Sequence, residues 1–147
     1  VRFVCGAAAL GALTRLENMG VQPYLLSNSI VGLVAQRLIR LLCPHCRQAY
    51  EADAYECEFL KLDEPPTLYR AVGCEKCAHE GYKGRQGIYE VIVIDDELRR
   101  MIHNGASELD LEQDARTKTG GIRDDGREKI LDGSTSVDEV MRVTMED

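Results

Sequence analysis

Two Cys-x-x-Cys pairs constrain this chain more than any other feature of its sequence. Cys43-Pro-His-Cys46 and Cys74-Glu-Lys-Cys77 are separated by 27 residues. Each pair lets two thiolates of one tight turn point at the same ion, and two pairs complete the tetrahedral four-sulfur shell that Zn²⁺ prefers. Because four protein ligands leave no open position for water, the pattern predicts a structural zinc site formed by Cys43, Cys46, Cys74 and Cys77.

Other interpretations of the cysteines are weaker. No convincing secretory leader accompanies them, so metal ligation is favoured over disulfides. A redox dithiol uses one Cys-x-x-Cys and not two, and cysteines packed in a core need no such spacing. His45 and His79 lie beside the pairs and are alternative ligands, but with four thiolates present we expect them to face solvent or to support the ligands. Cys5 and Cys57 are expected to be unpaired structural thiols.

Composition excludes several function classes. Lys plus Arg number 18 and Asp plus Glu 25, which gives a net charge of −7, and aromatic residues are only 5% with no Trp. This balance argues against a protein that neutralises phosphates or stacks bases, so no nucleic-acid partner is expected. The hydrophobic share of 44% suffices for a folded core. The most apolar stretch, Ile30 to Leu42, contains two arginines and is too short to span a bilayer.

Charge divides the chain into three segments. Residues 1–42 carry a net positive charge, residues 43–94 a net negative charge, and residues 95–147 a stronger negative charge. The change of sign predicts three structural units. The first residue is Val1 and not Met, which suggests that the chain is a fragment.

Periodicity predicts a mixed α and β fold. We expect helices over Ala7–Met19 and Ser29–Leu42, with a short extended piece from Val21 to Leu26 between them. A polar, helical excursion over Glu51–Leu62 separates the Cys-x-x-Cys pairs. Short strands are expected at Leu68–Val72 and, after a glycine-rich loop, at Ile88–Ile94. The last third reads as helices with capping residues at Ser107 and Ser136.

The expected Ser29–Leu42 helix is apolar on most of its surface, so it should be buried on more than one side. The rest of the chain offers it limited cover. We therefore expect an exposed apolar patch that drives self-association or binds a hydrophobic dye, and better solubility when Val31 and Leu38 are replaced by charged residues.

Several longer motifs of the chain together are typical of one protein family. The motifs are Gly11-Ala-Leu-Thr-Arg-Leu16, Met19-Gly-Val-Gln-Pro-Tyr24, Ala35-Gln-Arg-Leu-Ile-Arg40, Gly81-Tyr-Lys-Gly-Arg-Gln-Gly-Ile-Tyr-Glu90, Ile122-Arg-Asp-Asp-Gly126 and Val140-Met-Arg-Val-Thr144. In this order they resemble the secretion ATPases of the general secretion protein E family, which power type II secretion and whose close relatives power type IV pilus assembly. The match runs through nearly the whole chain from about Ala9.

The resemblance implies an α+β fragment, the C-terminal part of a RecA-like α/β ATPase domain. Residues 1–42 would be terminal helices of that domain, residues 43–94 an inserted tetracysteine zinc-binding subdomain with the following strand, and residues 95–147 a C-terminal helical subdomain. The full-length parent would bind ATP and Mg²⁺. It would act as a homo-hexameric ring in the cytoplasm, peripheral to the inner membrane and held there by secretion-platform proteins.

The chain itself departs from the family's nucleotide site. It contains no GxxxxGK[ST] phosphate loop, and the family's Walker B residues would lie upstream. Cys5, Gly6 and Ala7 stand where the family carries a His-Thr-Asn box. No catalytic or nucleotide-binding residue is therefore carried over, and the chain alone is expected not to hydrolyse ATP.

Some motif residues have no visible role in the sequence. Arg37, Arg40 and Arg85 are expected to be surface or packing arginines, and Tyr82 and Tyr89 to serve packing rather than ligand stacking.

Two alternative functions stay open. One is a fragment of a type IV pilus assembly ATPase, although the Arg-Asp-Asp-Gly and Met-Arg-Val-Thr motifs favour type II secretion. The other is a free-standing zinc-ribbon module that binds a protein.

Overall fold

The computed structural model describes residues 3–6 and 9–145 of the chain. Contacts divide the chain into two units. The first unit comprises Val1–Gln36 and Tyr89–Ile122, and the second comprises Arg37–Ile88 and Arg123–Asp147. The elements in chain order are β1 (Phe3–Gly6), α1 (Gly11–Asn18), α2 (Pro23–Ser29), β2 (Gly32–Leu42), β3 (Gln48–Glu51), α3 (Ala54–Leu60), β4 (Thr67–Arg70), the 3₁₀ turn η1 (Glu75–Cys77), β5 (Tyr82–Val93), α4 (Asp96–His103), α5 (Glu108–Lys118), α6 (Ile122–Leu131) and α7 (Val137–Thr144).

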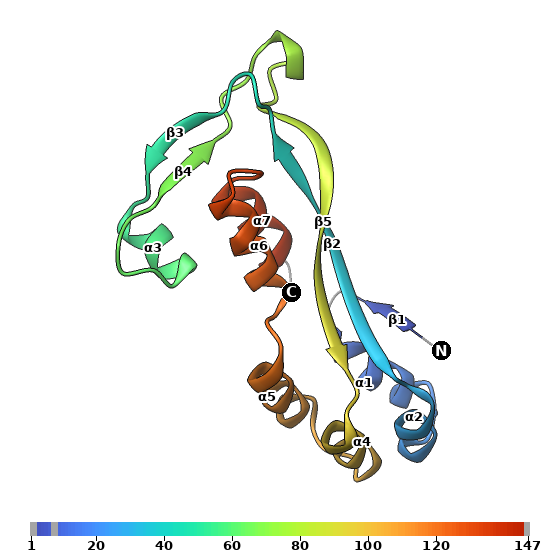
Figure 1. The fold of residues 1–147 in the computed structure, drawn as a ribbon. Helices are drawn as coiled ribbons and strands as arrows, with labels where there is room; N and C mark the ends of the chain where they lie inside the picture. The colour runs from blue at the N-terminus through green and yellow to red at the C-terminus, as the bar shows by residue number, and fades with distance from the viewer. Residues whose placement is uncertain (1–2, 7–8, 146–147) are drawn as a thin grey trace. The chain divides into compact units, whose positions relative to one another are not determined.

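The first unit is built on a sheet whose strand order is β1-β2-β5. β1 pairs in parallel with β2, with Cys5 opposite Val34. β2 and β5 run side by side in opposite directions, and both strands continue into the second unit (Figure 1). Apolar side chains of α1, α2, α4 and α5 form one core with the inward residues of the two strands, which include Leu33, Ala35 and Ile92. The fold is therefore a mixture of helix and strand, as the sequence predicts.

The predicted helix over Ser29–Leu42 is wrong. The chain forms α2 over Pro23–Ser29 and then the strand β2 over Gly32–Leu42, so the expected extended piece at Val21–Leu26 is wrong as well. Proline at the first position of a helix has a favourable fixed φ, which starts α2 at Pro23. The following run is rich in Val, Leu and Ile, and a short apolar run of this kind fits a strand as well as a buried helix.

The predicted strand at Ile88–Ile94 is correct but too short. β5 begins at Tyr82, so Gly84 and Gly87 lie within the strand and not in a loop. Gly84 has a φ of +91°, which a side chain would disfavour, and this accounts for a glycine inside a strand.

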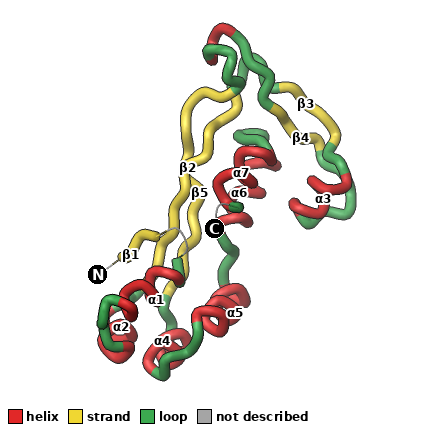
Figure 2. Tube along the Cα trace, turned by 180° about the vertical axis from the view of Figure 1, so that it is seen from behind, coloured by secondary structure: helices red, strands yellow, loops and turns green. Residues whose placement is uncertain are grey.

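The excursion between the cysteine pairs forms a hairpin with a helix at its tip. β3 and β4 are antiparallel, with Gln48 opposite Arg70, and α3 lies in the connection (Figure 2). Asp53 caps α3 by accepting the backbone N–H of Glu56, and the Glu56 side chain accepts the N–H of Asp53 in return. This reciprocal cap explains why the predicted helix forms in so polar a segment; β3 was not predicted.

The C-terminal helices are where the sequence places them. Asp95, Ser107 and Ser136 each accept a backbone N–H from the first turn of α4, α5 and α7. The three-segment division of the chain stays a prediction, because the two contact-defined units do not test it.

At Gly126, α6 packs closely against Val140 of α7 in the second unit. A Cβ built at Gly126 would lie 2.6 Å from Cγ1 of the buried Val140. We expect Gly126→Ala to lower the free energy of unfolding by roughly 1–3 kcal/mol, because overpacking outweighs the better helix propensity of Ala. Urea unfolding measures this, and Val140→Ala in the same chain should restore much of the loss. A more stable single variant would contradict the packing.

Candidate metal centre

The first pair of cysteines forms a tight turn at the end of β2. Cys43 follows the strand directly, and its carbonyl oxygen accepts the backbone N–H groups of Cys46 (3.3 Å) and Arg47 (3.0 Å). Pro44 has no backbone N–H to donate to a further ladder hydrogen bond, which favours the end of the strand here. The turn brings both sulfurs of the pair to one side.

The second pair is placed by η1 and by residues with unusual backbone conformation. The carbonyl of Cys74 accepts the N–H groups of Cys77 (3.1 Å) and His79 (2.9 Å), and Ala78 and His79 both have positive φ. Gly73 must be glycine, because its φ is +108° and a Cβ there would lie 2.5 Å from the carbonyl oxygen of His79. These contacts fix the backbone of residues 73–79 in a tight turn that contains both cysteines of the pair.

The four predicted cysteines come together. Their sulfurs all lie within 4.8 Å of one another. The Sγ–Sγ distances are 4.0 Å for Cys43–Cys74 and 3.8 Å for both Cys46–Cys77 and Cys74–Cys77. A tetrahedron with zinc–sulfur bonds of about 2.3 Å has edges of about 3.8 Å, so the cluster has the size of a four-thiolate zinc shell.

Burial and hydrogen bonds shift the pKa values of two of the thiols, Cys46 and Cys77, in opposite directions. Burial raises the pKa of the Cys46 thiol to about 11. Burial acts in the same direction on Cys77, but the N–H groups of Cys74 and Gly81 donate to its sulfur at 3.2 and 3.3 Å and lower its pKa to about 6. A metal cation favours the thiolate form of every ligand, and backbone N–H donors to sulfur stabilise the same form. The backbone therefore supports Cys77 as a thiolate.

The comparisons with known proteins agree with these motifs. Residues 4–142 match the model of the family described as Type II/IV secretion system protein. The chain belongs to this family. It is 54% identical over 142 residues to Type II secretion system protein E of Pseudomonas aeruginosa, and 51% identical over 140 residues to Type II secretion system ATPase E of Vibrio cholerae. These alignments cover 95% and 94% of the chain but 28% of each relative, so the chain spans just over a quarter of their length.

The resemblance to secretion ATPases seen in the sequence is thereby confirmed. A relative with a different name, Type II secretion system protein HxcR of Pseudomonas aeruginosa, is 45% identical over 92% of the chain and 26% of the relative. The described part of the chain contains no helix that is long and apolar enough to cross a membrane.

Among the described side chains, His45, His79 and Cys57 do not belong to the cluster of this secretion-family chain. His45 and His79 are exposed. Cys57 lies on α3, where it lines a separate hollow of about 530 Å³. Cys5 and Gly6, which stand where the family carries the first two residues of its His-Thr-Asn box, lie in β1. Ala7, at the third position of that box, lies outside the described residues.

A network beside the cluster was missed in the sequence. Arg40 is a packing arginine as expected, but its guanidinium lies 4.2 Å from the ring centroid of Tyr82 and donates to the buried carboxylate of Glu139 at 2.7 Å. Arg142 donates to the same carboxylate at 2.8 Å. The sequence pattern Ser136-x-x-Glu139 predicts only a capping box at the start of a helix, and it gives no signal for an arginine partner 99 positions away.

The other motif residues are placed as packing or surface groups. Arg37 donates to the carbonyl of Val143, and Arg85 is exposed. Tyr89 accepts a hydrogen bond of 3.4 Å from the Gln36 side chain.

The ion pairs of Glu139 make the second unit sensitive to acid. Burial raises the pKa of Glu139, but hydrogen bonds from Arg142, from the Arg40 side chain and from the Arg40 backbone N–H outweigh this effect and lower the pKa to about 2. A depressed carboxyl pKa contributes stability that is present above the unfolded value of about 4.5 and is lost as the pH falls toward 2. The two arginines are half exposed, so solvent screens their ion pairs. With that allowance, we expect the ion pairs of Glu139 to contribute about 2 kcal/mol to the free energy of unfolding at neutral pH.

The free energy of unfolding of wild type and of Glu139→Gln, measured from pH 7 to pH 3, checks this. The difference between the two should shrink as the pH falls below about 4.5. Glu128→Gln, an exposed change on α6, should show little pH-dependent difference, and a constant difference for Glu139→Gln would argue against the ion pairs.

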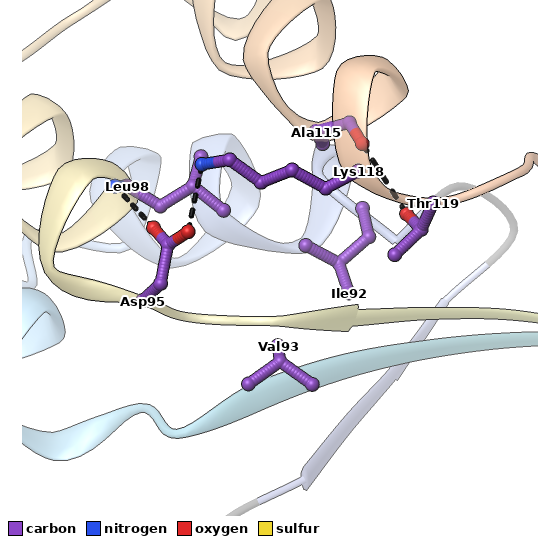
Figure 3. A pocket seen from close by; sticks show the side chains of 7 residues that line it. All are labelled: Ile92, Val93, Asp95, Leu98, Ala115, Lys118 and Thr119. Atoms are coloured by element: carbon purple, nitrogen blue, oxygen red, sulfur yellow. Dashed lines mark hydrogen bonds and ion pairs between the residues drawn. The ribbon is translucent and has the colours of Figure 1, made fainter.

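A second hollow lies in the first unit, between the end of β5 and helices α4 and α5. It measures about 170 Å³ and is lined largely by apolar side chains such as Ile92 and Leu98 (Figure 3). At its edge the Asp95 carboxylate accepts the Leu98 N–H and pairs with Lys118 at 2.7 Å, and these contacts lower the pKa of Asp95. The pair joins α4 to α5, which is a structural role.

Proposed function

We propose that this chain is the C-terminal portion of a motor ATPase that powers protein export through the type II secretion system. The observation that carries the proposal is the sequence identity of 54% and 51% to two relatives that are named as type II secretion proteins. The cluster of four cysteines in this chain supports it. The motor role comes from the family, since the chain spans only 28% of those relatives. The relatives' names also favour type II secretion over pilus assembly.

We propose that the cluster holds one structural Zn²⁺. Four sulfurs at tetrahedral spacing suit zinc, whereas Mg²⁺ and Ca²⁺ prefer oxygen ligands and bind thiolates poorly. The ligands Cys43 and Cys77 are buried, and four sulfurs leave no position for substrate. The metal would supply folding stability rather than chemistry.

The wider context of the parent belongs to the same proposal. A RecA-like ATPase domain would precede the zinc-binding part, with ATP and Mg²⁺ bound there. The parent would work as a homo-hexameric ring in the cytoplasm, peripheral to the inner membrane and in contact with secretion-platform proteins. The segments 1–42, 43–94 and 95–147 would be the end of the ATPase domain, the zinc-binding subdomain and the helical subdomain.

A segment exchange tests the proposed function. This chain would replace the matching segment of the Pseudomonas aeruginosa protein, in a strain that lacks the original, and secreted enzyme in the culture supernatant would be measured. We expect secretion to be restored, and a chimera with Cys43→Ser and Cys46→Ser to fail. A chimera that is stable and loaded with zinc but does not secrete would contradict the proposal.

The chain alone is predicted not to turn over ATP. It lacks a phosphate loop, whose backbone and lysine would cradle the β- and γ-phosphates. Phosphate release by the purified chain should stay at the level of a buffer blank, with the full-length relative as the positive control. Mg²⁺-dependent turnover by a clean preparation would show the prediction to be wrong.

A further inference from the structure

The loop between α6 and α7 is fixed to the two strands that carry the cysteine turns. The backbone N–H of Leu42 donates to the carbonyl of Ser134 at 2.8 Å, and the Thr135 hydroxyl donates to the carbonyl of Arg40 at 2.8 Å. Leu42 is the residue directly before Cys43. A loop more than ninety residues downstream therefore holds the strand end from which the first ligand projects.

The other strand is held by the same loop. The hydroxyls of Tyr82 and Ser136 lie 2.6 Å apart. Tyr82 directly follows Gly81, whose N–H donates to the Cys77 sulfur and whose carbonyl accepts the N–H of Cys43 at 2.9 Å. Both cysteine turns thus meet at Gly81, one residue from the Tyr82–Ser136 contact.

Further bonds strengthen the same attachment. Arg47, the residue after Cys46, donates to the carbonyl of Gly133 at 2.6 Å and lies over the ring of Tyr69. The Glu139 carboxylate accepts both the backbone N–H of Arg40 and its guanidinium. Thr135, Ser136 and Glu139 are at most 3% exposed, so these bonds are shielded from water.

From these contacts we infer that Ser136 and Glu139 are positioning residues of the metal centre. They act through Tyr82 and Arg40, which set the two strand ends from which the cysteine turns project. Residues that orient metal ligands without touching the metal commonly change metal affinity by about 10–100-fold when they are removed. Because coupling between two sites is reciprocal, metal binding must in turn order the loop and the start of α7. The inference rests on the proposed zinc site.

Zinc release to a chromogenic chelator tests the inference, at a temperature where every variant is folded. Tyr82→Phe removes only the hydroxyl that meets Ser136, and Glu139→Gln keeps the shape of the side chain. We expect both variants to release zinc about 10-fold faster or more than wild type. Tyr55→Phe, at an exposed tyrosine of α3, is the matched control for the loss of a hydroxyl, and Ile102→Ala in the first unit is the control for lower stability. Both controls should release zinc at the wild-type rate.

Two spectroscopic measurements complete the test. In the Co²⁺-loaded chain, the thiolate-to-metal absorption should be the same in wild type and variants, because the four ligands do not change. In the wild-type chain, chelation should speed amide hydrogen exchange over residues 133–140 more than over α4 and α5. Wild-type release rates in both variants, with unchanged exchange over 133–140, would overturn the inference but leave the zinc site intact. A wild-type chain that binds no zinc would overturn both.

Discussion

Replacing Cys77 with Ser is expected to abolish zinc binding and to unfold the second unit around the cysteine turns. The sulfur of Cys77 is buried and receives two backbone N–H groups, so no neighbouring group can take its place. Four-coordinate zinc sites contribute apparent free energies of about 10–16 kcal/mol in small zinc peptides, which exceeds the net stability of many domains. Zinc per chain should fall from one to nearly none by atomic absorption.

The chain provides a matched control in Cys57. Its thiol lies on α3 and outside the cluster, so Cys57→Ser should keep one zinc per chain and the wild-type unfolding curve. The first unit has its own core of apolar side chains, and we expect far-ultraviolet circular dichroism of Cys77→Ser to retain helical signal from it. Full zinc content in Cys77→Ser, in reducing buffer, would exclude the four-cysteine shell.

The clustering of the four cysteines could be predicted from the sequence because each turn is local. A Cys-x-x-Cys spacing fixes the direction of two sulfurs within four residues, and the sulfurs of Cys43 and Cys74 then meet as expected. The groups that hold the turns could not be predicted in the same way. Glu139 contacts Arg40 across 99 positions, and only the pairing of β2 with the C-terminal loop brings them together.

The strand β2 was missed for a different reason. Its polar residues Gln36, Arg37 and Arg40 are not spaced in strict alternation, because Arg37 and Arg40 are partly covered and reach the carbonyl of Val143 and the carboxylate of Glu139. The covered face of the strand carries Arg37 and the open face carries the apolar Leu38, so the alternation that identifies a half-buried strand is lost. The sequence therefore matched a buried helix equally well.

A pair of neighbouring substitutions separates the two interpretations of this segment. In β2, Ile39 is fully buried, whereas Leu38 on the opposite face is 52% exposed. We expect Ile39→Asp to cost more than about 4 kcal/mol, since it places an unpaired charge in the core, and to prevent folding of the second unit. Leu38→Asp should cost less than about 1.5 kcal/mol, chiefly through the low strand propensity of Asp.

Urea unfolding and soluble yield measure both variants, with Leu38→Ala and Ile39→Ala as neutral partners that remove each side chain without adding charge. Exposure of Val31 on the same segment means that Val31→Lys should also be tolerated. The solubility gain expected for charged residues at Val31 and Leu38 stays a prediction, now because both side chains are exposed, Val31 just before β2 and Leu38 within it. A helix turns by about 100° per residue, so apolar cover nearly all round would make the Leu38 and Ile39 variants similarly damaging. Equal costs at the two positions would contradict the strand, and a difference of several kcal/mol is its expected signature.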